Sequence, residues 1–133
     1  MPAKKVIATD AAPIAVGPYS QAIQAGNFLF LSGQLALNPQ NGEMVGSDIS
    51  TQTKQVIENI EGVLGAAGAS LSDVVKTTVF LQNMGDFAQM NDVYKQYFGD
   101  SAPARSTVEV AKLPKNALVE IESIAVIKSR RQL

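Results

Sequence analysis

The spacing of apolar residues along the chain predicts a first helix over residues 49–67. Within this segment the apolar side chains recur every three or four positions, which places them along one face of a helix. Asp48 precedes the segment and is a suitable N-cap, because its side chain can accept a hydrogen bond from the first turn. Gly68 follows it and suits the left-handed position that commonly ends a helix. The pattern therefore predicts an amphipathic helix with both ends defined.

A second helix is predicted over residues 87–98, where the same period recurs. Asp86 and Gln89 have the spacing of a capping box, and Gly99 is expected to end the helix. Asn91 lies on the apolar face of this helix. A polar side chain on such a face needs a hydrogen-bond partner, so Asn91 is either a structural amide with its own partner or a residue that serves a site.

Runs of β-branched and alternating residues predict strands elsewhere. Gly26-Asn27 separates the first two of these segments and suits a two-residue hairpin turn. The last segment could also be a helix, but its β-branched content favours a strand. The order of elements predicts an α+β fold with two main helices packed on one face of a mixed β-sheet. The segments are 22–25, 28–31, 74–82, 105–111 and 118–127.

Alternation within the last two predicted strands groups their polar residues by face. Arg105, Thr107 and Glu109 share one face of the first, and Glu120 and Glu122 share one face of the second. The two glutamates are about 6.6 Å apart along the strand. Apolar neighbours on their face mean that a carboxylate needs a partner there or takes up a proton, which makes it a candidate acid or base. The alternative is that this face is the solvent side of an edge strand.

Composition narrows the possible chemistry. The 133 residues are expected to form a single domain, 1–133, and they contain no His, Cys or Trp. Thiol nucleophiles, imidazole bases and the usual transition-metal ligands are therefore excluded. The content is 46% hydrophobic and only 17% charged, which suggests that copies of the chain cover part of its surface. The net charge of −1 gives no reason to expect nucleic-acid binding.

No segment has the length and composition of a membrane span or of a secretory signal, so the chain is expected to be cytoplasmic and without membrane contact. The basic cluster at 128–131 is smaller than the groups of charges that usually bind lipid or nucleic acid, and we interpret it as a solvated terminus.

Three short motifs could carry chemistry. Arg105, in Pro103-Ala104-Arg105-Ser106, has a planar guanidinium whose donors match the two oxygens of a carboxylate. Tyr19 is presented by a Gly-Pro turn, where it could donate to a ligand or simply pack. Ser32 and Gly33 combine a hydroxyl with a glycine that permits close approach to the backbone. These residues suggest a small site for a small carboxylic acid.

Taken together, these motifs resemble the RidA (YjgF/YER057c/UK114) family, and the likeness spans nearly the whole chain, from about Lys5 to Lys128. The resemblance implies a bacillus-type chorismate-mutase-like fold with a mixed six-stranded sheet. It also implies a homotrimer with its helices outside and clefts between subunits. The motifs that carry it are Gly17–Ala22, Ser32–Gln34, Met90–Tyr94, Pro103–Ser106 and Val119–Glu122.

The resemblance further implies an activity, that of a 2-iminobutanoate/2-iminopropanoate deaminase. Such an enzyme hydrolyses reactive 2-imino acids, formed from 2-aminoacrylate and 2-aminocrotonate, to 2-oxo acids and ammonia. Pyridoxal-phosphate-dependent dehydratases release these enamines, but the family itself uses no cofactor. The expected partners are therefore small 2-imino and 2-oxo acids.

By the same resemblance, Arg105 would bind the substrate carboxylate and Glu120 would position and deprotonate the attacking water. Thr107 occupies a position where many members have Cys, so any role that needs a thiol is excluded here, although Thr107 can still line the cleft. The remaining residues would shape and polarise the pocket, with Tyr19 counted among the catalytic ones. They are Tyr19, Ser32, Gly33 and Asn91.

The main alternative is a non-catalytic trimeric module that binds a 2-oxo acid and acts through a partner protein. Arg105 would serve either function, whereas Glu120 separates them, because a sensor needs no base. Ribonuclease activity is the weakest interpretation, since the chain has no His and no basic stripe interleaved with aromatic residues.

Overall fold

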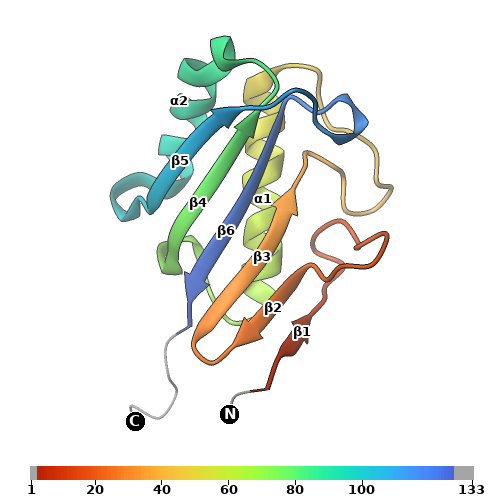
Figure 1. Ribbon diagram of the computed structural model, residues 1–133, viewed down its shortest axis with the longest axis vertical. Coiled ribbons are helices and arrows are strands. Elements are labelled where there is room, and N and C mark those ends of the chain that lie inside the picture. The colour runs from red at the N-terminus through yellow and green to blue at the C-terminus, as the bar shows by residue number, and fades with distance from the viewer. Residues whose placement is uncertain (1–2, 128–133) are drawn as a thin grey trace.

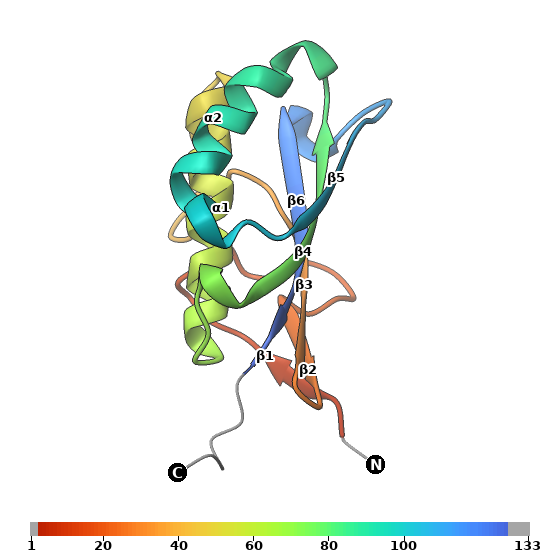
Figure 2. The ribbon, with the colours of Figure 1, turned by 90° about the vertical axis from the view of Figure 1, so that its left-hand side faces the viewer.

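The computed structural model describes residues 3–127, which form one mixed six-stranded sheet with two long helices on the same face (Figures 1 and 2). The strand order is β1-β2-β3-β6-β4-β5, and only β4 and β5 run parallel. The predicted α+β arrangement is confirmed. The strands are β1 (Lys5–Ile7), β2 (Ala22–Ala25), β3 (Phe28–Gln34), β4 (Val74–Leu81), β5 (Ala104–Glu109) and β6 (Val119–Val126), and the helices are α1 (Ile49–Ala66) and α2 (Phe87–Phe98).

The local signals at the hairpin and at α1 are confirmed. Gly26 has a φ of +61° in the turn between β2 and β3, a conformation that favours glycine. The side chain of Asp48 accepts a hydrogen bond from the Thr51 backbone N–H at 2.9 Å, as an N-cap should. Gly68 follows α1 with a φ of +77°. Residues close in sequence determine each of these features.

The predicted capping box of α2 is wrong, although the helix begins and ends where expected. The Asp86 side chain makes no capping hydrogen bond. A single 3₁₀ turn, Met84–Asp86, leads directly into α2 and leaves Asp86 at φ −86° and ψ 0°, not in the extended conformation typical of an N-cap. The cap lies one turn earlier, where Asn83 Oδ1 accepts from the Gly85 N–H at 2.8 Å.

The sheet adds one strand that the alternation did not reveal and decides one alternative that the sequence left open. β1 is a strand that the alternation did not reveal, because it has only three residues, paired antiparallel with β2 at the edge. β6 is not an edge strand, since it lies between β3 and β4. Its backbone is therefore paired on both sides, and the side chains of Glu120 and Glu122 are held on a central strand.

The core lies between the sheet and the helices. One side of α1 is buried against the side of β6 that carries Val119, Ile121, Ser123 and Ala125. Because side chains alternate along each strand, the same register directs the intervening residues to the face that no helix covers. The fully buried apolar residues of these two elements are Val56, Ile57, Ile60, Val63, Leu64, Val119, Ile121 and Ala125.

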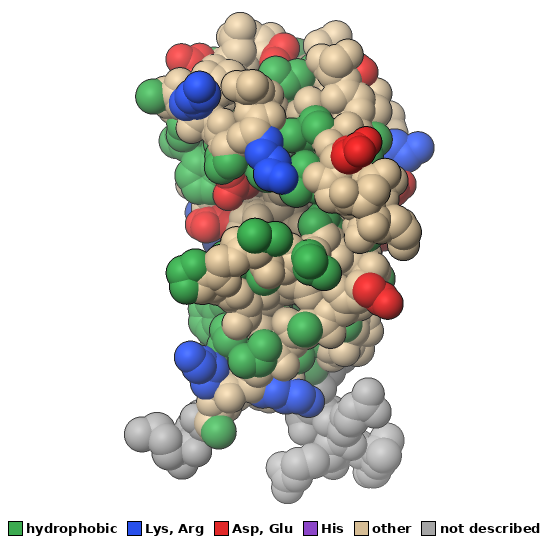
Figure 3. Space-filling model, turned by 90° about the vertical axis from the view of Figure 1, so that its right-hand side faces the viewer, with side chains coloured by type: hydrophobic (Ala, Val, Ile, Leu, Met, Phe, Trp, Pro, Cys, Tyr) green, Lys and Arg blue, Asp and Glu red, His purple; other side chains and the backbone are tan. Residues whose placement is uncertain are grey.

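The uncovered sheet face carries large apolar side chains. Phe28, Phe30 and Val108 are 49%, 44% and 42% exposed on it, and Val6 adds to them at the β1 edge. Figure 3, which shows one side of the molecule, has scattered acidic and basic side chains but no large area of a single charge. Within residues 3–127 no helix is long and apolar enough to cross a membrane.

Candidate functional site

The sheet separates the two residues that were expected to do most of the chemistry. Arg105 on β5 pairs in register with Thr77 of β4, whose side chain is completely buried on the helix side. Glu120 on β6 lies between Val119 and Ile121, which are both buried on that side, so its own side chain points to the opposite, uncovered face. Within one chain, therefore, Arg105 and Glu120 belong to two different surfaces.

Glu120 lines a cavity of about 660 Å³, which also brings together Tyr19, Ser32 and Gly33. These four predicted residues come from three separate segments: the loop before β2, strand β3 and strand β6. The rest of the cavity wall is largely apolar. The other lining residues are Ile14, Val16, Leu35, Leu37, Pro114, Lys115 and Glu122.

A β-bulge directs Ser32 and Gly33 toward this cavity. Between two regular pairs of the β3–β6 ladder, these two residues lie opposite a single residue of β6, Glu122. A bulge of this kind twists the strand and turns its side chains. Ser32 is fixed on its other edge, since its N–H donates to the Gln21 carbonyl at 3.0 Å and its hydroxyl donates to the Ser20 carbonyl at 2.6 Å. The Ser32 oxygen retains acceptor capacity toward the cavity.

The carboxyl group of Glu120 packs directly on the backbone of Gly33. A Cβ added at Gly33 would overlap Glu120 Oε2 and lie only 2.9 Å from Glu120 Cδ. Glycine is therefore the residue that leaves room for this carboxyl group. Burial raises the pKa of Glu120, and the negative charge of Glu122 raises it further. A carboxyl group whose pKa moves toward neutrality is suited to both taking and giving a proton.

Arg105 is held in a fixed orientation on the other surface, beside a cavity of about 390 Å³. Its Nη1 donates to Asn91 Oδ1 at 2.8 Å, so the partner that Asn91 was expected to need is Arg105. The guanidinium lies over the rings of Tyr94 and Phe87, at 4.7 and 5.4 Å from their centroids. Such stacking orients the planar group, and only one of its five N–H donors is taken up by Asn91.

Thr107 shares the helix-side face of β5 with Arg105 but does not line the same cavity. Its Oγ1 is buried and has no hydrogen-bond partner among residues 3–127. Buried hydroxyls usually have a partner, so the Thr107 hydroxyl is an exception to that rule.

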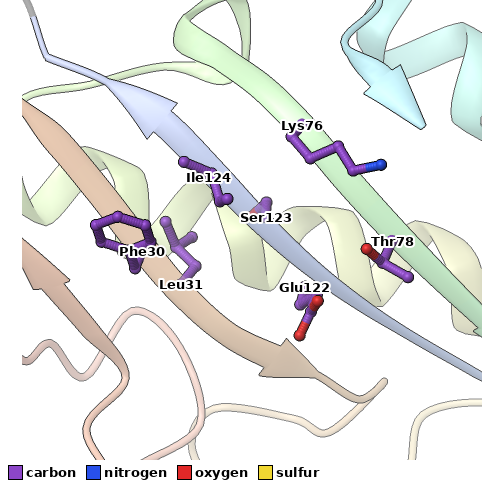
Figure 4. Close-up of a pocket in the computed structure, with 7 residues that line it drawn as sticks. All are labelled: Phe30, Leu31, Lys76, Thr78, Glu122, Ser123 and Ile124. Carbon is purple, nitrogen blue, oxygen red and sulfur yellow. The ribbon is translucent and has the colours of Figure 1, made fainter. Parts of the chain in front are cut away.

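A smaller cavity of about 280 Å³ lies on the uncovered face beside the first one, and Glu122 lines both (Figure 4). In Figure 4, Phe30 of β3 lies on one side of the cavity and Lys76 and Thr78 of β4 lie on the other, with Glu122 on β6 between them. Lys76 Nζ donates to Ser106 Oγ at 3.2 Å. Within residues 3–127, no cluster of acidic side chains is suited to hold a metal ion.

Sequence reasoning missed part of both surfaces. The i, i+4, i+7 spacing of Phe87, Asn91 and Tyr94 already placed them on one helix face, and this signal could have identified the cradle of Arg105. No comparable signal exists for Ile14 or Leu35, because loops that converge from distant parts of the chain have no period.

Comparisons with known proteins agree with this architecture. The family model described as Endoribonuclease L-PSP matches residues 9–127. A RutC family protein of Pyrococcus horikoshii is 60% identical over 122 residues, which are 92% of this chain and 97% of that protein. A 2-iminobutanoate/2-iminopropanoate deaminase of Dermatophagoides farinae is 51% identical over 96% of this chain and 100% of its own length. The crystal structure of YyfA from Yersinia pestis, a member of the Rid family whose function is unknown, is 52% identical with a TM-score of 0.91 over 94% of this chain and 100% of its own.

Proposed function

Because this chain belongs to the RidA (YjgF/YER057c/UK114) family, whose model is described as Endoribonuclease L-PSP, we propose that it hydrolyses reactive 2-imino acids to 2-oxo acids and ammonia. The observation that carries the proposal is the combination of an oriented guanidinium at Arg105 with a carboxyl group of raised pKa at Glu120. The name of the Dermatophagoides farinae relative supports the same activity.

Arg105 binds the substrate carboxylate in this proposal. Asn91 and the Tyr94 ring hold the guanidinium in one orientation before the substrate arrives, so little rotamer freedom is lost on binding. A bidentate pair with a carboxylate then contributes roughly 1.5–3 kcal/mol per hydrogen bond. Thr107 lies two residues along the same face of β5 and is proposed to line the cleft of the assembled protein.

Glu120 acts as the base. A water oxygen adds to the C2 carbon of the protonated imine while the Glu120 carboxylate takes one water proton. The nitrogen of the resulting carbinolamine takes this proton from Glu120, and the C–N bond breaks to release ammonia. The Glu120 carboxylate then accepts the hydroxyl proton, which leaves the 2-oxo group. Each step needs one group that both accepts and donates a proton, which the raised pKa of Glu120 favours.

No cofactor is needed in this scheme, because a protonated imine is already an electrophile. The site has to hold the carboxylate and orient one water, and general-base help of roughly 10²–10⁴-fold suffices for a compound that also hydrolyses in water. Tyr19, Ser32 and the backbone of Gly33 lie in the cavity beside Glu120 and can position the water. The imines themselves are supplied by dehydratases that release enamines.

The active assembly is proposed to be a homotrimer with chorismate-mutase-like packing and clefts between subunits. Arg105 and Glu120 lie on opposite faces of one chain's sheet, so a single chain cannot bring them to one small substrate. In a trimer, the Arg105 surface of one subunit would meet the Glu120 cavity of its neighbour. The exposed Phe28, Phe30 and Val108 on the uncovered face are then buried between subunits.

An imine-trapping assay tests the activity. An amino-acid oxidase generates 2-imino acids in the presence of semicarbazide, and the parent protein should suppress semicarbazone formation while the Arg105→Ala and Glu120→Gln variants should not. A folded Arg105→Ala trimer with normal turnover would exclude the carboxylate clamp. If the parent binds 2-oxobutyrate but never suppresses the semicarbazone, the alternative of a non-catalytic binding module replaces the enzyme.

Mixing the two inactive variants tests the shared cleft. After unfolding and refolding together in equal amounts, about a quarter of the clefts should pair an intact Arg105 with an intact Glu120 from the other variant, and activity should return to about that level. The same variants refolded separately are the control. Clefts made within one chain would give no recovery.

A further inference from the structure

Gln21 is a buried glutamine whose side chain binds only backbone groups. It is 4% exposed, and its Nε2 donates to the carbonyls of Pro13 at 2.7 Å, Thr9 at 3.0 Å and Ala12 at 3.3 Å. Its Oε1 accepts from the Thr9 N–H at 2.7 Å. One carboxamide thus satisfies four backbone groups of the segment 9–13, which lies outside the strands of the sheet.

These hydrogen bonds matter because the segment 9–13 is not part of a strand and does not pair with the sheet. Ala12 in this segment is fully buried and Thr9 and Pro13 are partly buried, so an unpaired carbonyl or N–H at these residues is unfavourable. The segment also packs closely on α1, where the Ala11 carbonyl group lies against Gly62. A Cβ added at Gly62 would overlap the Ala11 carbonyl oxygen and lie 2.9 Å from the carbonyl carbon. Gln21 and Gly62 therefore fix the segment against β2 and α1.

The segment continues directly into the wall of the Glu120 cavity, formed by Ile14, Val16 and Tyr19. Within one chain, Tyr19 is 53% exposed and Val16 is 78% exposed, so packing inside the subunit does little to hold either side chain. Gln21 also connects to the other wall through its backbone, since its carbonyl accepts from the Ser32 N–H at 3.0 Å. A single residue thus joins the Tyr19 wall to the Ser32 wall.

We infer that Gln21 is a positioning residue for the cleft, which holds the Tyr19 segment at a fixed distance from Ser32 and Glu120. The inference rests on the proposed function for its kinetic part alone. Gln21 touches no substrate, because its carboxamide is turned toward the segment 9–13 and its donors and acceptor are occupied. Its effect on catalysis is therefore indirect, through the placement of Tyr19.

Gln21→Met tests this inference, because methionine keeps the shape of the side chain but makes none of the four hydrogen bonds. Hydrogen exchange of the peptide that covers residues 9–19 should become faster, while exchange in α1 stays as in the parent. In the imine-trapping assay, kcat should fall by about tenfold or more, with KM little changed because Arg105 still binds the carboxylate.

Ile57→Ala is the control for a merely structural role. Ile57 is completely buried on α1 and lies outside the cavity, so its truncation lowers Tm without altering the Tyr19 segment. It should keep the parent kcat and the parent exchange rates in residues 9–19. Gln21→Asn keeps the carboxamide but shortens the side chain by one methylene, so it should fall between the parent and Gln21→Met, and it serves if the methionine variant does not fold.

Two results would overturn the inference: unchanged exchange of residues 9–19 in the Gln21 variants, or a loss of kcat in Ile57→Ala equal to theirs. If the parent shows no turnover of any imino acid, the proposed function fails, and the exchange measurement still decides whether Gln21 holds the segment.

Discussion

Gly33→Ala should separate catalysis from folding, because the added methyl group would occupy the space of the Glu120 carboxyl group. The new Cβ would overlap Glu120 Oε2 and lie 2.9 Å from Glu120 Cδ, whereas ordinary contacts begin at 3.4 Å. The carboxyl group must therefore retreat by on the order of 1 Å, and a displacement of that size in a reacting group lowers the rate by about 10²-fold.

Stability should change little in the same variant. Gly33 is not one of the glycines with a positive φ, so alanine can adopt its backbone conformation. The obstructing atoms belong to the end of a flexible side chain, which can move toward the cavity. The smaller entropy of the unfolded chain offsets part of the remaining strain, so we expect a change within about 1 kcal/mol, or a few degrees in Tm.

The assay is steady-state turnover in the imine-trapping system, with thermal unfolding of each variant. Gly65→Ala is the matched control, because a Cβ at Gly65 of α1 meets nothing within 4 Å, and alanine should stabilise the helix while kcat stays unchanged. In a Glu120→Gln background, Gly33→Ala should lower kcat no further, since both changes act on the same group. A Gly33→Ala protein with parental kcat and KM would refute the placement of the base.

Three further outcomes are expected. The folded state raises the pKa of Glu120 above its ordinary value of 4.5, so the free energy of unfolding falls as the pH rises from 4.5 through the folded-state pKa. Glu120→Gln should therefore be more stable than the parent at neutral pH, and urea unfolding should show that this difference vanishes in acid. Arg105→Lys keeps the charge but loses the fork of donors and its stacking on Tyr94, so KM in the trapping assay should rise by roughly tenfold or more; an unchanged KM would exclude bidentate binding. Tyr94→Phe leaves the buried Thr77 hydroxyl without its 2.7 Å partner and should lower the free energy of unfolding by about 1–3 kcal/mol, part of which Thr77→Val should restore.

Local pattern determined most of the elements. The period of α1, the cap at Asp48 and the hairpin turn at Gly26 depend on residues within a few positions of one another, and each was confirmed. The predicted capping box of α2 was wrong, because the conformation of Asp86 does not depend on its own motif alone. Asp86 and Gln89 have the right spacing, but the 3₁₀ turn that ends at Asp86 sets its backbone conformation. The three residues of β1 were too few for alternation to reveal.

The same local rules assigned the candidate residues to faces without relating one strand to another. Alternation shows that Arg105 and Thr107 share a face, and that Glu120 and Glu122 share a face. It does not show that the two faces are on opposite sides of the sheet. That relation comes from the pairing of β5 with β4 and of β4 with β6, which joins residues some thirty to fifty positions apart.

The sequence by itself therefore determined which elements form and which residues are capable of the chemistry, because both follow from side chains and their near neighbours. Tertiary structure alone decided that Glu120 packs on Gly33, that Gln21 holds the segment carrying Tyr19, and that Arg105 lies on the other face. The physical reason is that strand register and loop contacts are long-range. They are selected by hydrogen bonding and burial across the whole chain, and no short window of sequence contains them.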